Sequence, residues 1–330
     1  MTRIGAMLAV GVSALLLVAT SVLAEPAIIY DIGGKFDKSF NESAYTGAES
    51  WKAKTGSEYR EIEIQSEAQR EQAIRRLASG GSNPIVMTGF SFQSILSAVA
   101  PDFPDTKFTI IDSVVDQPNV RSVVFSEHEG SYLVGVIAGL TTKSNIVGFV
   151  GGMDVPLIRR FACGYVQGVK DVNADAQIIQ QMTGNDPSAW NDPVKGSEIT
   201  KSQIASGADI VYHAAGGTGV GVLQAAHDAG ILGIGVDSNQ NHLHPGSVLT
   251  SMIKRVSVAV EDAFSGGADA PAGVYVLGVA EDGVGYSMDE HNAPLISEEV
   301  MMAVEARRDA IIDGSLSVHN YTTDDSCPAS

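Results

Sequence analysis

The stretch DIGGKFDKSFNESAYTG, residues 31–47, gathers residue types that commonly bind ligands, directly after the apolar run PAIIY. Its aromatic rings can stack on a flat ring, its carboxylates accept hydrogen bonds, and the amide of Asn41 both donates and accepts them. Glycines next to Asp31 permit close approach of a ligand or a tight loop. Asp31 itself could bind a ligand or simply cap the loop or the following helix, and the stretch alone leaves both possibilities open.

The chain lacks the motifs that would require catalysis. The glycine string GGTGVG at residues 216–221 follows a predicted strand but does not match the G-x-G-x-x-G pattern of dinucleotide-binding loops. P-loop, G-x-S-x-G, C-x-x-C and H-E-x-x-H patterns are also absent from the sequence. His242 and His244 could share a metal ion, but no third ligand lies near them in sequence, which favours a solvated loop. We therefore expect no metal, no cofactor and no enzymatic activity.

The first 24 residues have the pattern of a cleaved secretory signal peptide. A short basic start precedes an apolar run at residues 4–18. The small residues Val22 and Ala24 suit a cleavage site directly after Ala24. An uncleaved membrane anchor is the alternative, although the run is shorter than the roughly 20 residues that span a bilayer. Because no cysteine lies near Ala24, we expect a protein secreted to the periplasm and not a lipoprotein.

Charge and cysteine content narrow the partners and the compartment. The formal net charge of −18 disfavours nucleic acid and anionic membranes as partners. The two cysteines of the sequence, Cys163 and Cys327, can form a disulfide in an oxidising compartment, and the alternative is two unpaired thiols.

Short β-branched runs alternate regularly with helical patterns along the chain. This alternation predicts an α/β fold with parallel sheets covered by helices on both faces. The predicted strands are 27–31, 59–64, 84–88, 107–112, 122–125, 145–150, 176–181, 209–213, 232–236, 248–252 and 274–279. The predicted helices are 39–55, 67–78, 91–99, 131–141, 157–172, 193–205, 219–229, 256–264 and 297–313.

Two passages, AIIYDIGG and NIVGFVGG, begin similar strand–loop–helix units and predict two Rossmann-like lobes. We assign residues 1–24 to the signal peptide, residues 25–143 and 252–280 to lobe 1, and residues 144–251 and 281–330 to lobe 2. Such a division joins the lobes by several short segments, which is the usual form of a hinge. The cleft between the lobes would face the carboxyl ends of the strands, where open α/β sheets bind ligands.

The opening stretch, D-x-G-G-x-x-D-x-S-F-N, resembles the start of the basic membrane protein (Bmp, PnrA-like) family, which includes the purine-nucleoside receptors of ABC importers. Further blocks of similarity follow in the same order, among them FPDTKFTIID, HEGSYLVGVIAG, VGFVGGMDVPLIRRFACGYVQG, HAAGGTG, GVDSNQ, TSMIKRV and EDGVG. The resemblance implies the fold of a type I periplasmic binding protein. It also implies a purine nucleoside (adenosine, guanosine or inosine) as the ligand and an ABC permease of the inner membrane as the partner of a monomeric receptor.

The resemblance implies eight ligand-binding residues in this chain. Those matched to the base-binding end of the cleft would stack on the purine or hydrogen-bond to its edge, and the others would contact the ribose. The base-contacting residues are Asp31, Phe40, Asn41, Asp112 and Phe161, and the ribose-contacting residues are Gly216, Asp237 and Lys254.

Each of these assignments has a structural alternative. Phe40 and Phe161 could be core residues, and Asp237 and Lys254 could form a structural salt bridge instead of binding a sugar. Some family members bind riboflavin or other ring compounds, so a flavin or a free nucleobase stays open as the ligand. A nucleoside-processing enzyme on the same fold is the more distant alternative.

Overall fold

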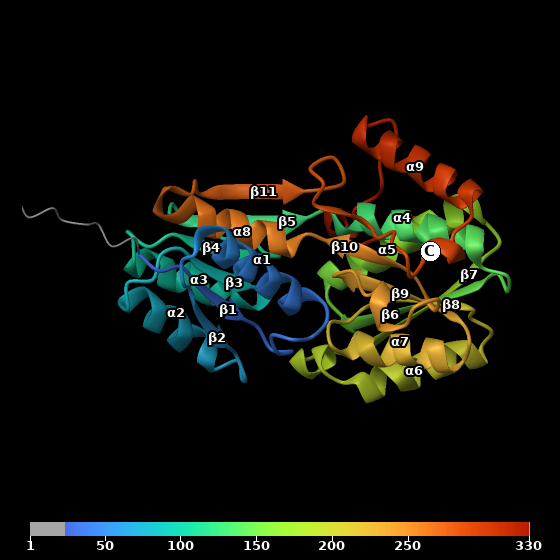
Figure 1. Cartoon of the computed structure of the whole chain (residues 1–330), viewed down its shortest axis with the longest axis horizontal. Coiled ribbons are helices and arrows are strands. Elements are labelled where there is room, and N and C mark those ends of the chain that lie inside the picture. Colours follow the sequence, from blue (N-terminus) through green and yellow to red (C-terminus); the bar gives the residue numbers. More distant parts are fainter. Residues whose placement is uncertain (1–23, 330) are drawn as a thin grey trace, which may run out of the picture.

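The computed structural model describes residues 24–329, which form two α/β lobes, each with a six-stranded sheet. Figure 1 shows the lobes lying side by side along the long axis of the molecule. The predicted two-lobe α/β fold is confirmed. Apart from Ala24, the predicted signal peptide lies outside the described residues.

The sheet of the first lobe is entirely parallel, in the order β11-β5-β4-β3-β1-β2. Its central strands are buried on both faces and consist almost entirely of apolar residues, as parallel sheets covered on both faces require. The strands are β1 (Ala27–Tyr30), β2 (Arg60–Glu63), β3 (Ile85–Thr88), β4 (Phe108–Ile111), β5 (Val120–Phe125) and β11 (Gly273–Leu277).

The sheet of the second lobe has the order β12-β10-β9-β8-β6-β7 and is parallel except for β12, which runs antiparallel to β10. The strands are β6 (Ile146–Met153), β7 (Gln177–Gly184), β8 (Ile210–Ala214), β9 (Leu232–Asp237), β10 (Val248–Lys254) and β12 (Val284–Tyr286). The short strand β12 was not predicted, because its sequence, VGY between glycine and serine, has the composition of a turn. Its partner β10 lies in the second sheet up to Lys254, so the chain returns to the first lobe only after that residue.

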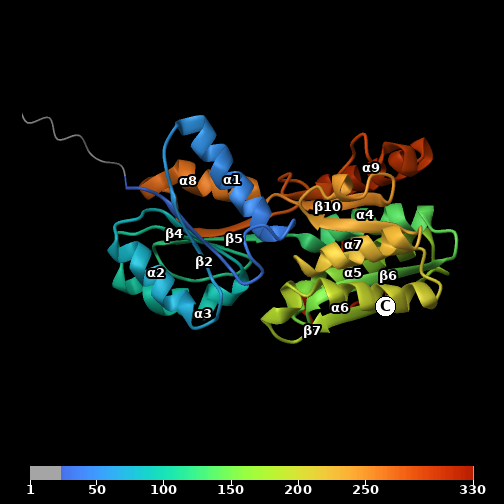
Figure 2. The same ribbon diagram turned by 60° about the horizontal axis from the view of Figure 1, so that its bottom comes forward.

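Helices cover both faces of each sheet, as Figure 2 shows for the two lobes. In the first lobe α1 packs with α8 and α2 with α3, while in the second lobe α4 packs with α5 and α6 with α7. The helices are α1 (Phe40–Thr55), α2 (Gln69–Ser79), α3 (Gln93–Val99), α4 (Glu127–Thr141), α5 (Pro156–Val172), α6 (Pro193–Ala205), α7 (Thr218–Asp228), α8 (Val256–Gly266) and α9 (Glu298–Ile312).

Helices α4 and α5 approach very closely because glycines lie at their interface. A Cβ atom at Gly168 would lie 2.0 Å from the carbonyl oxygen of Tyr132, and one at Gly164 would lie 2.3 Å from that of His128. Helix α4 also packs on α9, β10 and β12, so it belongs to the second lobe. The assignment of residues 25–143 to the first lobe is therefore wrong for this helix: the chain crosses between the lobes before Glu127.

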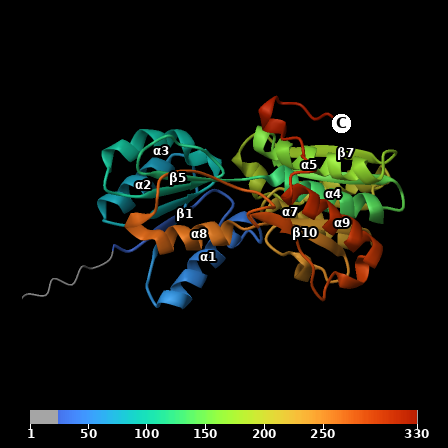
Figure 3. The same cartoon turned by 90° about the horizontal axis from the view of Figure 1, so that it is seen from above.

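Three segments connect the lobes, between β5 and α4, between β10 and α8, and between β11 and β12. Figure 3, seen from above, shows these connections running together between the two lobes. The arrangement lets the lobes move relative to each other while the strand ends stay opposed.

We predict that Gly168→Ala destabilises the protein by about 1–3 kcal/mol, because the added methyl group must push α4 and α5 apart. Thermal unfolding followed by circular dichroism would measure the change. Gly285→Ala is the matched control, since nothing lies within 4 Å of a Cβ atom at that position. Equal melting temperatures for the two variants would contradict the packing argument.

Candidate functional site

The carboxyl ends of the strands in both lobes line one cleft with roughly 630 Å³ of space not occupied by protein atoms. Part of this space is open to the surrounding solvent. The lining comes from both lobes and includes all eight predicted binding residues: Asp31, Phe40, Asn41, Asp112, Phe161, Gly216, Asp237 and Lys254. The cleft brings these residues together, and their contacts with a ligand stay a prediction.

The loop after β1 is held in shape by the side chain of Asn41. Its Nδ2 donates to the carbonyl oxygens of Asp31 and Gly34, both at 3.2 Å, and its Oδ1 accepts from Thr88 Oγ1 at 2.9 Å. Both amide protons are therefore used within the loop, which leaves only acceptor capacity on Oδ1 for a ligand. Asn41 acts first as the residue that shapes the binding loop.

One carboxylate oxygen of Asp31 is also hydrogen-bonded within the protein. Its Oδ1 accepts from Nε and Nη2 of Arg70 at 3.0 and 2.8 Å, and the Arg70 side chain is itself buried. The carboxylate thus links β1 to α2, a structural role different from the capping considered for it, while the residue still lines the cleft.

Asp37, which the sequence analysis missed, caps the start of α1. Its carboxylate accepts backbone N–H groups from Ser39, Asn41 and Glu42 at 2.8, 3.0 and 3.1 Å. Burial raises the pKa of Asp37 to about 7, although the three N–H donors act in the opposite direction. The signal was present in the sequence, because an Asp just before a helical pattern is a typical capping residue.

The charged centre of the cleft is Lys254, whose side chain is 1 % exposed. Its Nζ donates to Asp112 Oδ2 at 2.6 Å and lies 3.0 Å from Glu127 Oε1. Burial alone would lower the pKa of Lys254, but Asp112, Glu127 and Asp237 raise it above its ordinary value. The lysine therefore stays charged, and it pairs with Asp112 and Glu127 rather than with Asp237 as the sequence analysis expected.

Aromatic rings surround the same ammonium group. Lys254 Nζ lies 5.1 Å from the ring centroids of Phe40 and Phe125 and 5.6 Å from that of Phe161. Phe40 begins α1 in the first lobe and Phe161 lies on α5 in the second, so the two rings approach the cleft from opposite sides. Cation–π attraction adds to the ion pairs in stabilising the buried lysine.

Asp112 keeps one carboxylate oxygen without a partner. Oδ2 is paired with Lys254, whereas Oδ1 is buried and no donor among residues 24–329 reaches it. Burial raises the pKa of Asp112 to about 6, while Lys254 lowers it. A buried acceptor without a donor costs roughly 1–3 kcal/mol, so a ligand N–H or O–H placed here would recover that energy.

Asp237 occupies the corresponding position in the second lobe. Asp112 directly follows β4 and Asp237 ends β9, the strands that are third in the spatial orders given above, and both residues have a left-handed backbone, with φ of 68° and 63°. Asp237 Oδ2 accepts a hydrogen bond from Ser39 Oγ at 2.5 Å, and burial raises the pKa of Asp237. The bond crosses from the second lobe to the start of α1 in the first.

Further hydrogen bonds hold the lobes against each other at this point. Ser238 Oγ donates to the carbonyl oxygen of Ser39, and Gln240 Nε2 donates to that of Lys38, both at 2.9 Å. Together with the Ser39–Asp237 bond they bring the two rims of the cleft into direct contact.

Trp190, also missed from the sequence, contributes a further aromatic side chain from the second lobe. It ends the 3-10 helix η3 (Pro187–Trp190) and lines the cleft. A Cβ atom added at Gly33 in the first lobe would lie 3.8 Å from the Cβ of Trp190. One added at Gly216 would lie 3.4 Å from the carbonyl oxygen of Trp190. A Cβ at Gly216 would thus make only ordinary contact with Trp190, and the left-handed backbone, with φ of 55°, is what favours glycine at this position.

Two α/β lobes with a cleft at their strand ends are the architecture of solute-binding proteins, and this chain is similar to a solved structure of that class. A solute-binding protein of an ABC transporter system from Aeropyrum pernix K1 superposes with a TM-score of 0.81 at 28 % identity, covering 89 % of this chain and 92 % of that one. The predicted fold of type I periplasmic binding proteins is confirmed.

The chain belongs to the Bmp family of ABC transporter substrate-binding proteins, since the family profile described as "ABC transporter substrate-binding protein PnrA-like" matches residues 26–320. The "ABC transporter nucleoside-binding protein BmpA" of Lactococcus lactis is 34 % identical, over 88 % of each chain. The "CD4+ T-cell-stimulating antigen" of Listeria monocytogenes is 36 % identical, over 88 % of this chain and 87 % of the relative. The predicted family is thus confirmed.

The predicted localisation is wrong. We expected a secreted periplasmic protein that is not a lipoprotein, but relatives from Pyrococcus abyssi and Pyrococcus horikoshii, 34 % and 33 % identical, are named as uncharacterized lipoproteins. In a lipoprotein, as those relatives are named, a covalent lipid holds the protein at the membrane surface without a spanning helix.

Residues 24–329 contain neither a membrane-spanning helix nor a metal-binding cluster. No helix there combines the length and the apolar character needed to cross a membrane. His, Cys, Asp and Glu side chains in the same part of the chain do not gather into a group that could hold a metal ion.

We predict that Lys254→Met destabilises the protein by about 3–5 kcal/mol, because Asp112 and Glu127 lose the cation they share. Chemical denaturation at pH 7.5 would measure the loss, and the loss should shrink at pH 5.5, where Asp112 becomes protonated. Lys52→Met is the control, since Lys52 pairs with Glu58 on the surface and its removal should change stability little. A loss for Lys254→Met as small as that of the control would contradict the role of the buried cluster.

Proposed function

We propose that this chain is the receptor of an ABC importer for a purine nucleoside, adenosine, guanosine or inosine, which it captures between its lobes and delivers to the permease. The observation that carries the proposal is the unpartnered Oδ1 of Asp112 in a cleft lined by aromatic rings from both lobes. The name of the Lactococcus lactis relative, a nucleoside-binding protein, supports the same ligand class.

The purine would lie between Phe40 and Phe161, with its hydrogen-bonding edge toward Asp112. Stacking of a base on an aromatic ring contributes roughly 1–3 kcal/mol in nucleic-acid binding, and it accepts any flat base. Selection among bases then depends on Asp112, whose ionised oxygen accepts a hydrogen bond but cannot donate one. Ring N–H and exocyclic amino groups of purines are suitable donors.

The ribose would lie toward Asp237 and Gly216. A carboxylate can accept hydrogen bonds from two adjacent hydroxyl groups, and Asp237 still has one oxygen that does not bond to Ser39. Gly216 and Trp190 bound the cleft next to Asp237 and would limit the size of the sugar end.

Capture would depend on lobe closure, because a ligand shifts a conformational equilibrium only through its higher affinity for one state. A ligand that touches Phe40 and Phe161 at once binds better to the closed lobes than to open ones. The bonds from Ser39, Ser238 and Gln240 across the cleft rims would add to this preference. The closed, monomeric receptor would then be the form that the permease recognises.

We infer that the protein binds its ligand without transforming it. Relatives of known type are substrate-binding proteins of ABC transporters. The carboxylates Asp31, Asp37 and Asp112 each pair with a neighbouring cation or with backbone N–H groups. Release of free base from a nucleoside incubated with the protein would contradict this inference.

The proposed ligand can be tested by the melting temperature of refolded, ligand-free protein in the presence of nucleosides, free bases, ribose and riboflavin. A ligand at 100 times its dissociation constant stabilises the folded state by about 2.7 kcal/mol, which gives a clear shift. We expect shifts with purine nucleosides only. A shift with riboflavin or a free base alone would keep the family and change the ligand.

The ribose assignment predicts that Asp237→Ala weakens inosine binding at least about tenfold more than hypoxanthine binding, because only the nucleoside has hydroxyl groups to lose. Isothermal titration calorimetry with both ligands would give the ratio. Ser39→Ala is the matched control: it removes the bond across the cleft rim but leaves the carboxylate, so it should weaken both ligands equally. If Asp237→Ala leaves the ratio of inosine affinity to hypoxanthine affinity unchanged, the ribose contact is refuted.

A further inference from the structure

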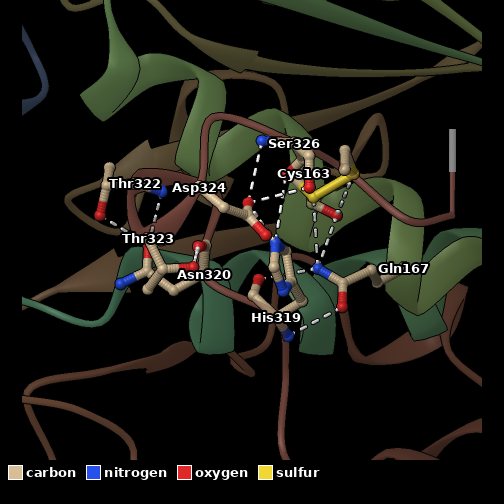
Figure 4. The surroundings of a disulfide bond; sticks show 9 residues. Cys163, Gln167, His319, Asn320, Thr322, Thr323, Asp324 and Ser326 are labelled. Carbon is tan, nitrogen blue, oxygen red and sulfur yellow. Dashed lines mark hydrogen bonds and ion pairs between the residues drawn. A yellow bond between two sulfur atoms is a disulfide. The ribbon is translucent and has the colours of Figure 1, made fainter.

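The end of the chain returns to α5, the helix that carries Phe161 into the cleft. Cys327 forms a disulfide with Cys163 on this helix, with their Cα atoms 5.6 Å apart. One turn further along α5, Gln167 Nε2 donates to the carbonyl oxygen of His319 at 3.0 Å, and the N–H of His319 donates to Gln167 Oε1 at 2.9 Å. Figure 4 shows these two attachments around the disulfide.

A third attachment involves Arg160, whose Nη2 donates to Thr322 Oγ1 at 2.9 Å. Positions 160, 163 and 167 lie on one face of α5, so residues 318–327, the C-terminal strap, cover that face. The position of Thr322 is fixed within the strap, because Asn320 Oδ1 accepts from its N–H at 3.1 Å and from its hydroxyl at 2.9 Å.

The other side of the Arg160 guanidinium faces the charged centre of the cleft. Its Nη1 donates to Glu127 Oε2 at 2.7 Å and to the carbonyl oxygen of Phe125 at 2.9 Å. Glu127 is fully buried and lies 3.0 Å from Lys254, which in turn holds Asp112. A continuous series of contacts thus connects the strap to the carboxylate with the free oxygen.

Charge balance makes this connection consequential. Lys254 serves two buried carboxylates, and Arg160 supplies the second positive charge that Glu127 needs. If Arg160 moves away from Glu127, the Glu127 carboxylate attracts the Lys254 ammonium group more strongly. The ion pair between Lys254 and Asp112 is then weakened. An uncompensated buried carboxylate is costly and tends to take up a proton, and a protonated Asp112 no longer accepts on both oxygens.

We propose that the C-terminal strap is a positioning element for the binding cleft: by holding Arg160 between Thr322 and Glu127, it keeps Lys254 on Asp112. The effect of the strap on ligand affinity rests on the proposed function. The electrostatic connection from the strap to Asp112 does not depend on it. The disulfide fixes the strap to α5, so its reduction would act on the cleft in the same direction as loss of the Thr322 hydroxyl.

The link can be measured without any ligand by the NMR titration of the Asp112 carboxyl carbon, assigned with Asp112→Asn. The charged groups that face Asp112 are Lys254 on β10, Glu127 at the start of α4 and Asp237 at the end of β9. Asp31 and Asp37 line the same cleft. Weaker neutralisation by Lys254 raises the titration midpoint. We expect Thr322→Val and the double variant Cys163→Ser/Cys327→Ser each to raise it by at least about 0.5 pH units.

Two controls isolate the proposed route. Thr323→Val removes the neighbouring hydroxyl, which bonds only within the strap, and should leave the Asp112 titration unchanged. In an Arg160→Lys background, Thr322→Val should have no further effect, because contributions that act through one residue are not additive. A Thr322→Val titration equal to that of Thr323→Val overturns the proposal, and this holds even if the cysteine variant fails to fold.

Inosine affinity, measured with the same variants, tests whether the strap affects ligand binding. Thr322→Val should weaken binding by about two- to tenfold at pH 7.5, and more at pH 5.5, whereas Thr323→Val should not. A shifted titration with unchanged affinity would overturn the role of the strap in binding. If the unmodified protein binds no nucleoside at all, the proposed function is wrong, and the titration still decides whether the strap controls Asp112.

Discussion

The structure depends on neutralising one buried cation, Lys254. The lysine comes from a strand of the second lobe, Asp112 from a strand end of the first, and Glu127 from the helix that follows the first crossing. Breaking a buried pair by removing one partner typically costs about 3–5 kcal/mol, so none of these side chains can leave its place freely. The cluster therefore fixes how the two strand-end edges face each other.

The surroundings of the cluster follow from the same constraint. Rings of Phe40, Phe125 and Phe161 surround the ammonium group of Lys254 and help to bury it beside the cleft. The glycines between α4 and α5 bring Glu127 and Phe161 close to the same point, since those helices begin at the cleft. Packing and charge thus bring these side chains around one oxygen of Asp112 that no donor within residues 24–329 reaches.

The sequence predicted most of the elements, although not β12, and the family resemblance named eight residues that line the cleft, although not Asp37 and Trp190. It was not sufficient for side chains whose partners lie far away in sequence. Arg160 and Thr322 are 162 positions apart, and no periodicity relates them. Helix α4 was placed in the wrong lobe for the same reason, since its contacts with α5, α9, β10 and β12 show where it packs. The role of Asn41 also changed, because its donors are used by backbone carbonyls that a sequence motif does not display.

Asp112 and Asp237 occupy equivalent places in the two sheets, and both adopt a left-handed backbone that non-glycine residues seldom take. Each such residue stores of order 1 kcal/mol or more of strain, which glycine would release. Glycine would, however, remove the carboxylate. At these two positions natural selection for a more heat-resistant chain and selection for the proposed ligand contacts would pull in opposite directions, so the internal symmetry of the fold marks two places where stability and the proposed binding compete.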